Sequence, residues 1–188
     1  MGGDERKRLF LALRLPGDAL DEIERWQADQ LPRDVRAVSR DHLHVTLAFL
    51  GSRPADEIDA IVDALRAAAS RAAEIRLTPV RYRETRGVGM LVLDDASGNA
   101  AVFAGDLHER LERLGVYRRE PRPWLPHVTV ARWREPPKLQ PELPSSRTFV
   151  PSDAAAYLSR LRPGGAEYRV LQSVALPLND SGPTVGGE

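Results

Sequence analysis

The fold and chemistry of this chain are best approached through ten residues, His42-Leu43-His44-Val45-Thr46-Leu47-Ala48-Phe49-Leu50-Gly51, whose pattern returns in Pro126-His127-Val128-Thr129-Val130-Ala131-Arg132. Each stretch contains His-x-Thr followed by an aliphatic residue, and its β-branched and aliphatic content is typical of a β-strand. Successive side chains of a strand point to opposite faces. The pattern therefore predicts one polar face per strand, formed by His44 and Thr46 in the first and by His127 and Thr129 in the second.

A single polar pair would be ordinary patterning for the solvent-facing side of an antiparallel sheet. Two pairs are more informative, because the chain has only four histidines and the two motifs lie about half the chain apart. We expect two similar halves, each of which supplies one His-x-Thr strand to a shared groove. The predicted fold is α+β and two-lobed with approximate twofold symmetry, in which antiparallel sheets form the central groove and helices lie outside.

Apolar periodicity and turn residues predict the other elements. Residues 1–178 are expected to form one domain and residues 179–188 a disordered tail, because the tail is rich in small residues. Asp18 is expected to cap the first helix, and Gly51-Ser52 to close the first motif strand. The further strands are expected at about 8–15, 35–38, 75–82, 90–93, 155–161 and 168–176, and the helices at 18–30, from 52 or 54 to about 68, and at 99–114.

Composition restricts the classes of function. The 188 residues include 27 basic and 27 acidic side chains, so no overall field attracts nucleic acid and any anion site must be local. The absence of cysteine excludes disulfides, thiol catalysis and cysteine-bound metal. The apolar run near the N-terminus is too short for a signal peptide or a membrane span, so we expect a soluble, cytoplasmic protein. We also expect a monomer.

Two histidines beside one phosphodiester can act as a base and an acid, because the unperturbed pKa of histidine lies near neutral pH. One takes a proton from the attacking oxygen and the other gives a proton to the leaving oxygen. Threonine hydroxyls on the same face can donate hydrogen bonds to the non-bridging phosphate oxygens. Such a scheme needs no metal.

The two motifs, HVTL at 44–47 and HVTV at 127–130, resemble the signature of the 2H phosphoesterase superfamily. Their wider contexts, HLHVTLAFLG and PHVTVAR, are similar to the RNA 2′,3′-cyclic phosphodiesterases, historically called 2′-5′ RNA ligases. The late segments 157–160 and 165–168 also resemble that branch. The similarity extends over roughly residues 8–176.

The resemblance implies hydrolysis of RNA 2′,3′-cyclic phosphate ends, tRNA fragments among them, to 2′-phosphates without metal or nucleotide cofactor. It implies His44 as the proton donor to the 3′ oxygen and His127 as the proton acceptor from water, beside the two threonines that bind the phosphate. The reverse reaction would join a 5′-hydroxyl to the cyclic phosphate through a 2′-5′ bond. The resemblance also implies Arg132 as a phosphate contact and Phe49 as a base-stacking or site-shaping residue.

Strand parity conflicts with two of these implied roles. By strict alternation, Phe49 and Arg132 point away from their histidines. A bulge, a twist or a strand end would be needed to bring either side chain to the site. Packing in the core is an equal alternative for Phe49.

Other interpretations of the polar residues stay open. His42, His44 and His127 could together bind a metal, but Asp41 is the only obvious acidic partner, which disfavours a zinc site. His108 lies in a predicted helix beside charged residues and is expected to be a solvated surface histidine.

The arginines around the second motif form either a solvated loop or a phosphate-binding rim, and the two tryptophans that flank the motif either stack on bases or pack beneath the groove. They are Arg118, Arg119, Arg122, Arg132 and Arg134, with Trp124 and Trp133. Two alternative functions remain: a non-catalytic nucleotide- or RNA-binding module, and a phosphodiesterase for another small cyclic phosphate, such as ADP-ribose cyclic phosphate.

Overall fold

One antiparallel sheet runs through the molecule. The computed structural model describes residues 6–145, 147–163 and 165–178. In this part of the chain the strand order is β4-β5-β6-β3-β1-β7-β8, with β2 attached to β6, and all neighbours are antiparallel. The strands are β1 (Arg6–Arg14), β2 (Arg36–Ala37), β3 (His44–Pro54), β4 (Thr78–Glu84), β5 (Val88–Asp94), β6 (His127–Arg132), β7 (Asp153–Arg162) and β8 (Gly165–Ala175).

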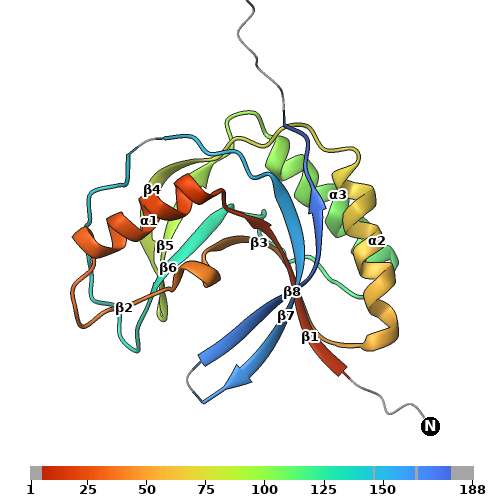
Figure 1. The fold of residues 1–188 in the computed structure, drawn as a ribbon, viewed down its shortest axis with the longest axis horizontal. Coiled ribbons are helices and arrows are strands. Elements are labelled where there is room, and N and C mark those ends of the chain that lie inside the picture. Colours follow the sequence, from red (N-terminus) through yellow and green to blue (C-terminus); the bar gives the residue numbers. More distant parts are fainter. Residues whose placement is uncertain (1–5, 146, 164, 179–188) are drawn as a thin grey trace, which may run out of the picture.

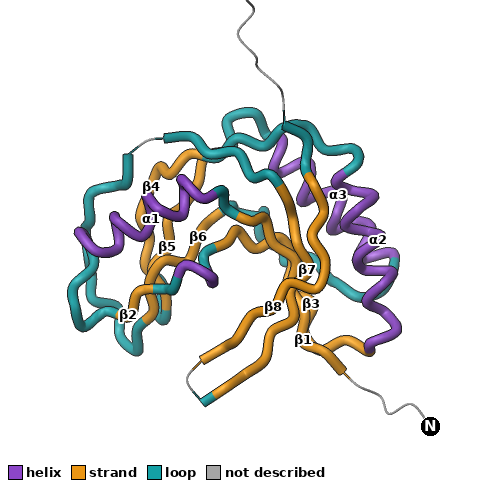
Figure 2. Tube along the Cα trace, viewed as in Figure 1, coloured by secondary structure: helices purple, strands orange, loops and turns teal. Residues whose placement is uncertain are grey.

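The helices lie on one side of the curled sheet (Figure 1). They are α1 (Gly17–Gln30), α2 (Ile58–Ala69) and α3 (Asn99–Arg113), with 3₁₀ turns η1 (Arg40–His42) and η2 (Ala55–Glu57). Figure 2 shows α1 over β4, β5 and β6, and α2 with α3 beside the half that contains β1, β3, β7 and β8. The predicted α+β fold with outer helices is confirmed, and the β3–β6 contact joins the strands of the two halves into one sheet. No helix in the described ranges has the length and apolarity that a membrane crossing requires.

Several predicted boundaries differ from the structure. Helix α1 begins at Gly17 after Pro16, and Asp18 accepts a hydrogen bond from the Ala19 amide inside the first turn instead of capping the helix. Strand β3 continues through Gly51, whose φ of 68° glycine adopts without steric cost, and remains paired with β1 as far as Pro54. The turn η2 therefore delays the second helix to Ile58. The predicted tail at 179–188 lies outside the described residues.

The sheet buries different residues on its two faces. The helix-facing side carries the main core, in which Leu9, Leu11 and Leu13 of β1 join apolar side chains of β3, β6 and the helices. The opposite side carries a smaller cluster of Phe10, Ala12, Ala155 and Tyr157, against which Tyr168 packs. This second cluster is important for the site because it lies on the face that the helices leave uncovered.

Each half of the chain contributes a strand, a helix and a motif strand, as β1–α1–β3 and β5–α3–β6. Each helix contacts the motif strand of the other half. Gln27 of α1 donates a hydrogen bond to the Val130 carbonyl in β6, and His108 of α3 is hydrogen-bonded to the Leu47 carbonyl in β3. The two halves are therefore interlocked through their helices.

Gly89 of β5 lies opposite Ala131 of β6 in a tightly packed position. A Cβ at this position would be 2.5 Å from the Tyr82 hydroxyl and 2.7 Å from the Trp133 ring. We expect Gly89→Ala to lower the free energy of unfolding by about 1–3 kcal/mol through overpacking, measured by urea denaturation. The control is Gly87→Ala, because no atom lies within 4 Å of its added Cβ. Equal stabilities of the two variants would contradict the packing described here.

Candidate active site

The two His-x-Thr motifs lie side by side on adjacent strands. Val45 of β3 is paired with Val128 of β6, and both valines are fully buried on the helix-facing side. The antiparallel register then puts each histidine opposite the threonine of the other motif, on the uncovered face. Diagonal neighbours in such a pair are about 7–8 Å apart, a separation that suits two groups acting on one phosphate. The structure thus brings His44 and His127 together, as the sequence predicts.

His127 is held in a defined tautomer. Its Nδ1 lies 2.8 Å from the backbone carbonyl oxygen of Leu125. A carbonyl only accepts hydrogen bonds, so Nδ1 carries the proton, and in the neutral ring Nε2 is left with a free lone pair. His127 is therefore arranged to accept a proton at Nε2.

His44 lies against the aromatic cluster of the uncovered face. Its ring centroid is 5.0 Å from that of Phe10, 5.8 Å from that of Tyr168 and 5.9 Å from that of Tyr157. Burial lowers the pKa of His44 to about 4, and a hydrogen bond to the backbone of His42 opposes this effect. At neutral pH the unliganded protein therefore carries His44 as an uncharged ring.

Three neighbouring side chains disfavour a positive charge on His44. The charges of His42, His127 and Arg132 all lower the pKa of His44 further. His42 closes the turn η1 and does not belong to β3, which corrects the prediction of a strand from residue 42. Its ring lies 4.4 Å from that of Tyr168, which keeps it beside His44. Among these neighbours, Arg132 places a guanidinium charge near the paired motifs.

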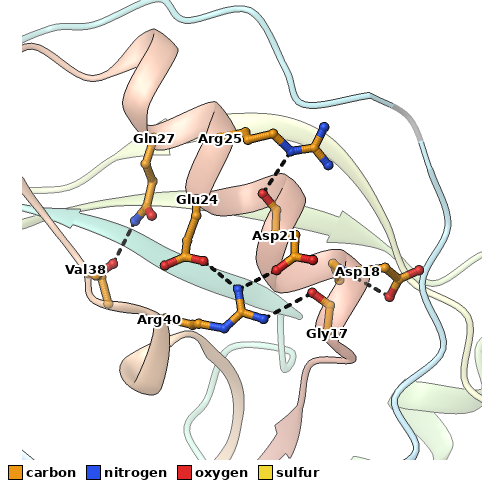
Figure 3. Close-up of polar contacts among 9 residues, drawn as sticks. Gly17, Asp18, Asp21, Glu24, Arg25, Gln27, Val38 and Arg40 are labelled. Atoms are coloured by element: carbon orange, nitrogen blue, oxygen red, sulfur yellow. Dashed lines mark hydrogen bonds and ion pairs between the residues drawn. The ribbon is translucent and has the colours of Figure 1, made fainter.

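The turn that precedes His44 is anchored to α1 through Arg40. The Arg40 guanidinium lies 2.7 Å from a carboxylate oxygen of Asp21 and 2.5 Å from one of Glu24 (Figure 3). The same group donates a longer hydrogen bond to the carbonyl of Gly17. These contacts tie the start of β3 to the helix.

Both motif strands contain a bulge after the threonine. In β3 the pairing with β1 passes from Thr46 to Ala48, which leaves Leu47 as the extra residue. In β6 the pairing with β5 passes from Thr129 to Ala131, which leaves Val130 as the extra residue. The burial patterns agree, because two consecutive buried residues follow the threonine in each strand.

A bulge shifts the parity of the residues that follow it. Phe49 and Arg132 consequently lie on the same face as the histidines, as the implied roles require. Phe49 is 55% exposed, so the alternative of core packing is wrong. The influence of Arg132 on the pKa values of His42 and His44 agrees with its position on this face.

Two of the arginines around the second motif form ion pairs with nearby glutamates. Arg119 contacts Glu112 at 2.9 Å, and Arg122 contacts Glu120 at 3.2 Å. These contacts favour the interpretation of a solvated loop for both side chains. No group of three or more His, Cys, Asp or Glu side chains in the described ranges could hold a metal ion.

The two tryptophans that flank the second motif are hydrogen-bonded to backbone carbonyls. The indole of Trp124 donates to Thr46 at 3.0 Å, and the indole of Trp133 donates to Thr85 at 3.1 Å. Both rings are half-buried, and Trp124 packs against the main core. These contacts favour the packing interpretation over base stacking.

His108 is not a surface residue, so this expectation was wrong. Its side chain is buried, with Nε2 2.7 Å from the carbonyl oxygen of Leu47 and its ring 4.8 Å from that of Tyr117. The sequence does contain a signal, because His108 is spaced by four and three residues from the buried Ala104 and Leu111.

A family model described as the 2′-5′ RNA ligase superfamily matches residues 15–161. The chain belongs to this superfamily. The resemblance drawn from the two motifs is thereby confirmed.

Curated relatives and solved structures extend this relationship. The chain is 28% identical over 176 residues to the RNA 2′,3′-cyclic phosphodiesterase of Escherichia coli K12, covering 92% of this chain and 98% of the relative. The crystal structure of Escherichia coli LigT complexed with 3′-AMP is similar with a TM-score of 0.78 at 26% identity, covering 93% of this chain and 100% of LigT. A solved structure from Thermus thermophilus gives a TM-score of 0.78 at 26% identity, covering 90% of this chain and 97% of the other.

The partly buried His44 makes stability depend on pH. The unfolded chain binds a proton at this residue below about pH 6.5, whereas the folded protein does so only near pH 4. We therefore expect the free energy of unfolding to fall by on the order of 1–3 kcal/mol as the pH decreases through this window, and His44→Phe to flatten the decrease. Urea denaturation of both proteins at a series of pH values measures the difference. Parallel curves for the two proteins would contradict the burial of a neutral ring.

Proposed function

We propose that this chain hydrolyses the 2′,3′-cyclic phosphate ends of RNA to 2′-phosphates by acid–base catalysis with its two motif histidines. The observation that carries this proposal is the Val45–Val128 pair, which sets His44 and His127 diagonally on one uncovered face. The RNA 2′,3′-cyclic phosphodiesterases among its relatives support the reaction class. The complex of LigT with 3′-AMP supports a nucleoside phosphate as the kind of ligand that such a fold binds.

In the proposed step a water molecule attacks the phosphorus atom opposite the 3′ oxygen. His127 accepts the water proton at Nε2, the bond between phosphorus and the 3′ oxygen breaks, and His44 gives a proton to that oxygen. The products are a 2′-phosphate and a 3′-hydroxyl. Each proton transfer is worth about 10²–10⁴-fold in rate. With a 5′-hydroxyl as the attacking group in place of water, the same step forms a 2′-5′ phosphodiester bond and frees the 3′-hydroxyl.

The remaining site residues are assigned to binding. Thr46 and Thr129 donate hydrogen bonds to the non-bridging oxygens, where negative charge increases in the transition state. Arg132 adds a positive charge on the same face, and the exposed ring of Phe49 offers a surface on which a base can stack. We propose RNA ends, tRNA fragments among them, as substrates of a cytoplasmic monomer.

The proton on His44 must be acquired as the substrate binds. Burial keeps its pKa near 4 in the free protein, so a neutral ring meets the substrate. An adjacent phosphate anion favours the charged form of an imidazole and raises its pKa. Binding of the phosphate anion thus favours the protonated form of His44, which then donates the proton to the leaving oxygen.

Product analysis tests the proposed reaction. We expect the protein to open an RNA oligomer that ends in a 2′,3′-cyclic phosphate, in the presence of EDTA, and to yield the 2′-phosphate, as resolved by phosphorus NMR. A 3′-phosphate product would contradict the assignment of the leaving oxygen. Faster turnover of a cyclic mononucleotide or of ADP-ribose cyclic phosphate would identify another small cyclic phosphate as the substrate, and tight binding without turnover would indicate a binding module.

Variants of the motif residues test the assigned roles. We expect His44→Ala and His127→Ala each to reduce kcat by about 10²–10⁴-fold, because each removes one proton transfer. Thr46→Val and Thr129→Val should each reduce kcat by about 10²-fold, through the loss of one transition-state hydrogen bond. The matched control is Thr78→Val on β4, a threonine outside the site that is hydrogen-bonded to Thr148. A motif variant with wild-type kcat would remove that residue from the mechanism.

A further inference from the structure

At each of the two bulges, a buried polar side chain from a helix is hydrogen-bonded to the backbone of the bulged residue. The bulged residues, Leu47 and Val130, each follow their histidine by three positions. The Leu47 carbonyl oxygen lies 2.7 Å from Nε2 of His108, and the Val130 carbonyl oxygen lies 2.8 Å from Nε2 of Gln27. His108 is 6% exposed and Gln27 is 7% exposed. The same contact is thus made twice, at corresponding places in the two halves.

A bulge needs such a partner for a physical reason. The extra residue interrupts the regular ladder, and a buried carbonyl that loses its ladder partner must find another donor. Leu47 and Val130 lie on the helix-facing side, where water is excluded. A donor from a helix therefore stabilises the bulged strand relative to a regular strand with the opposite parity.

The two donors differ in the number of contacts they make. Gln27 also donates to the carbonyl of Val38 at 2.9 Å, as Figure 3 shows, and the Val130 carbonyl accepts a second hydrogen bond from the Val38 amide. Gln27 thereby fastens the β6 bulge to the segment after β2. The His108 ring donates to Leu47 through Nε2, which fixes its tautomer because a carbonyl cannot donate.

We propose that Gln27 and His108 are positioning residues that hold the two bulges and thereby keep Arg132 and Phe49 on the face of the two histidines. The expected effects on turnover depend on the proposed function, since they assume that Arg132 and Phe49 contact the substrate. The effect of Gln27 on the placement of Arg132 does not depend on the proposed function. Neither positioning residue touches the substrate.

The first test combines Gln27 with Arg132. Gln27→Met keeps the side-chain length and removes both donors, and it should lower kcat/KM about tenfold, mainly through KM, as Arg132→Met should. The double variant should lose no more than either single variant, because both changes remove the same contact. The matched control is Trp26→Phe, which removes a hydrogen bond from the neighbouring position of α1 to Glu142 and should change kcat/KM less than about twofold. Additive losses in the double variant would overturn the proposal.

The second test needs no substrate. The pKa of His42 is lowered by burial and by the charges of Arg132 and Arg36, against the opposing charge of Asp41. An NMR titration should therefore show the same rise in the pKa of His42 in Gln27→Met as in Arg132→Met, and no rise in Trp26→Phe. An unchanged His42 in Gln27→Met would overturn the proposal. Absence of turnover in every protein, the wild type included, would refute the proposed function. The NMR titration of His42 would then still decide whether Gln27 positions Arg132.

The third test uses His108 and also covers the case in which Gln27→Met does not fold. His108→Phe keeps a ring beside Tyr117 but removes the donor, whereas His108→Gln retains a donor of the kind that Gln27 supplies. We expect His108→Phe to lower kcat/KM about tenfold without adding to the loss in Phe49→Ala, and His108→Gln to restore most of it. Equal activity of the Phe and Gln variants would overturn the role of His108.

Discussion

The register between β3 and β6 is the constraint on which the candidate site depends. Val45 and Val128 are paired and fully buried, and this one pairing decides which side chains share the uncovered face. A slip of one residue would turn a histidine and its threonine into the core, where neither could keep its partners. The main core therefore fixes the candidate site, because the valines that it buries alternate along each strand with the histidine and threonine of the motif.

The two motifs are alike in sequence but differ in surroundings. His44 lies against Phe10, Tyr157 and Tyr168, and burial among these rings suppresses its charge. His127 is anchored through Nδ1 by the carbonyl of Leu125, which leaves Nε2 free. Unequal neighbours thus give two chemically identical side chains different environments, and the asymmetry comes from β1, β7 and β8, which lie only on the β3 side of the sheet.

The sequence predicts the strands, the helices and the polar face of each motif because these depend on short-range periodicity. It does not predict the bulges, since Leu47-Ala48 and Val130-Ala131 are compatible with a regular strand, and only pairing with β1 and β5 reveals the extra residue. The burial of His108 is indicated by its helical spacing from Ala104 and Leu111, but the hydrogen-bond partner of His108 is not. Its partner is a carbonyl sixty-one positions away, which local patterning cannot indicate. Phe49 and Arg132 reach the site only through such long-range contacts.

The exchange of helices between the halves affects how the chain must be assembled. The contact of Gln27 with Val130 spans 103 positions, and β1 is inserted between β3 and β7, which is synthesised much later. When only the first half has been synthesised, β3 lacks its contact with α3, and β1 lacks its neighbour β7. Closing such long loops delays folding, because the entropy cost precedes the stabilising contacts. The ribosome must release most of the chain before β3 can pair with β6. Partial translation products would therefore expose unpaired strand edges, and the two motifs would not yet lie side by side.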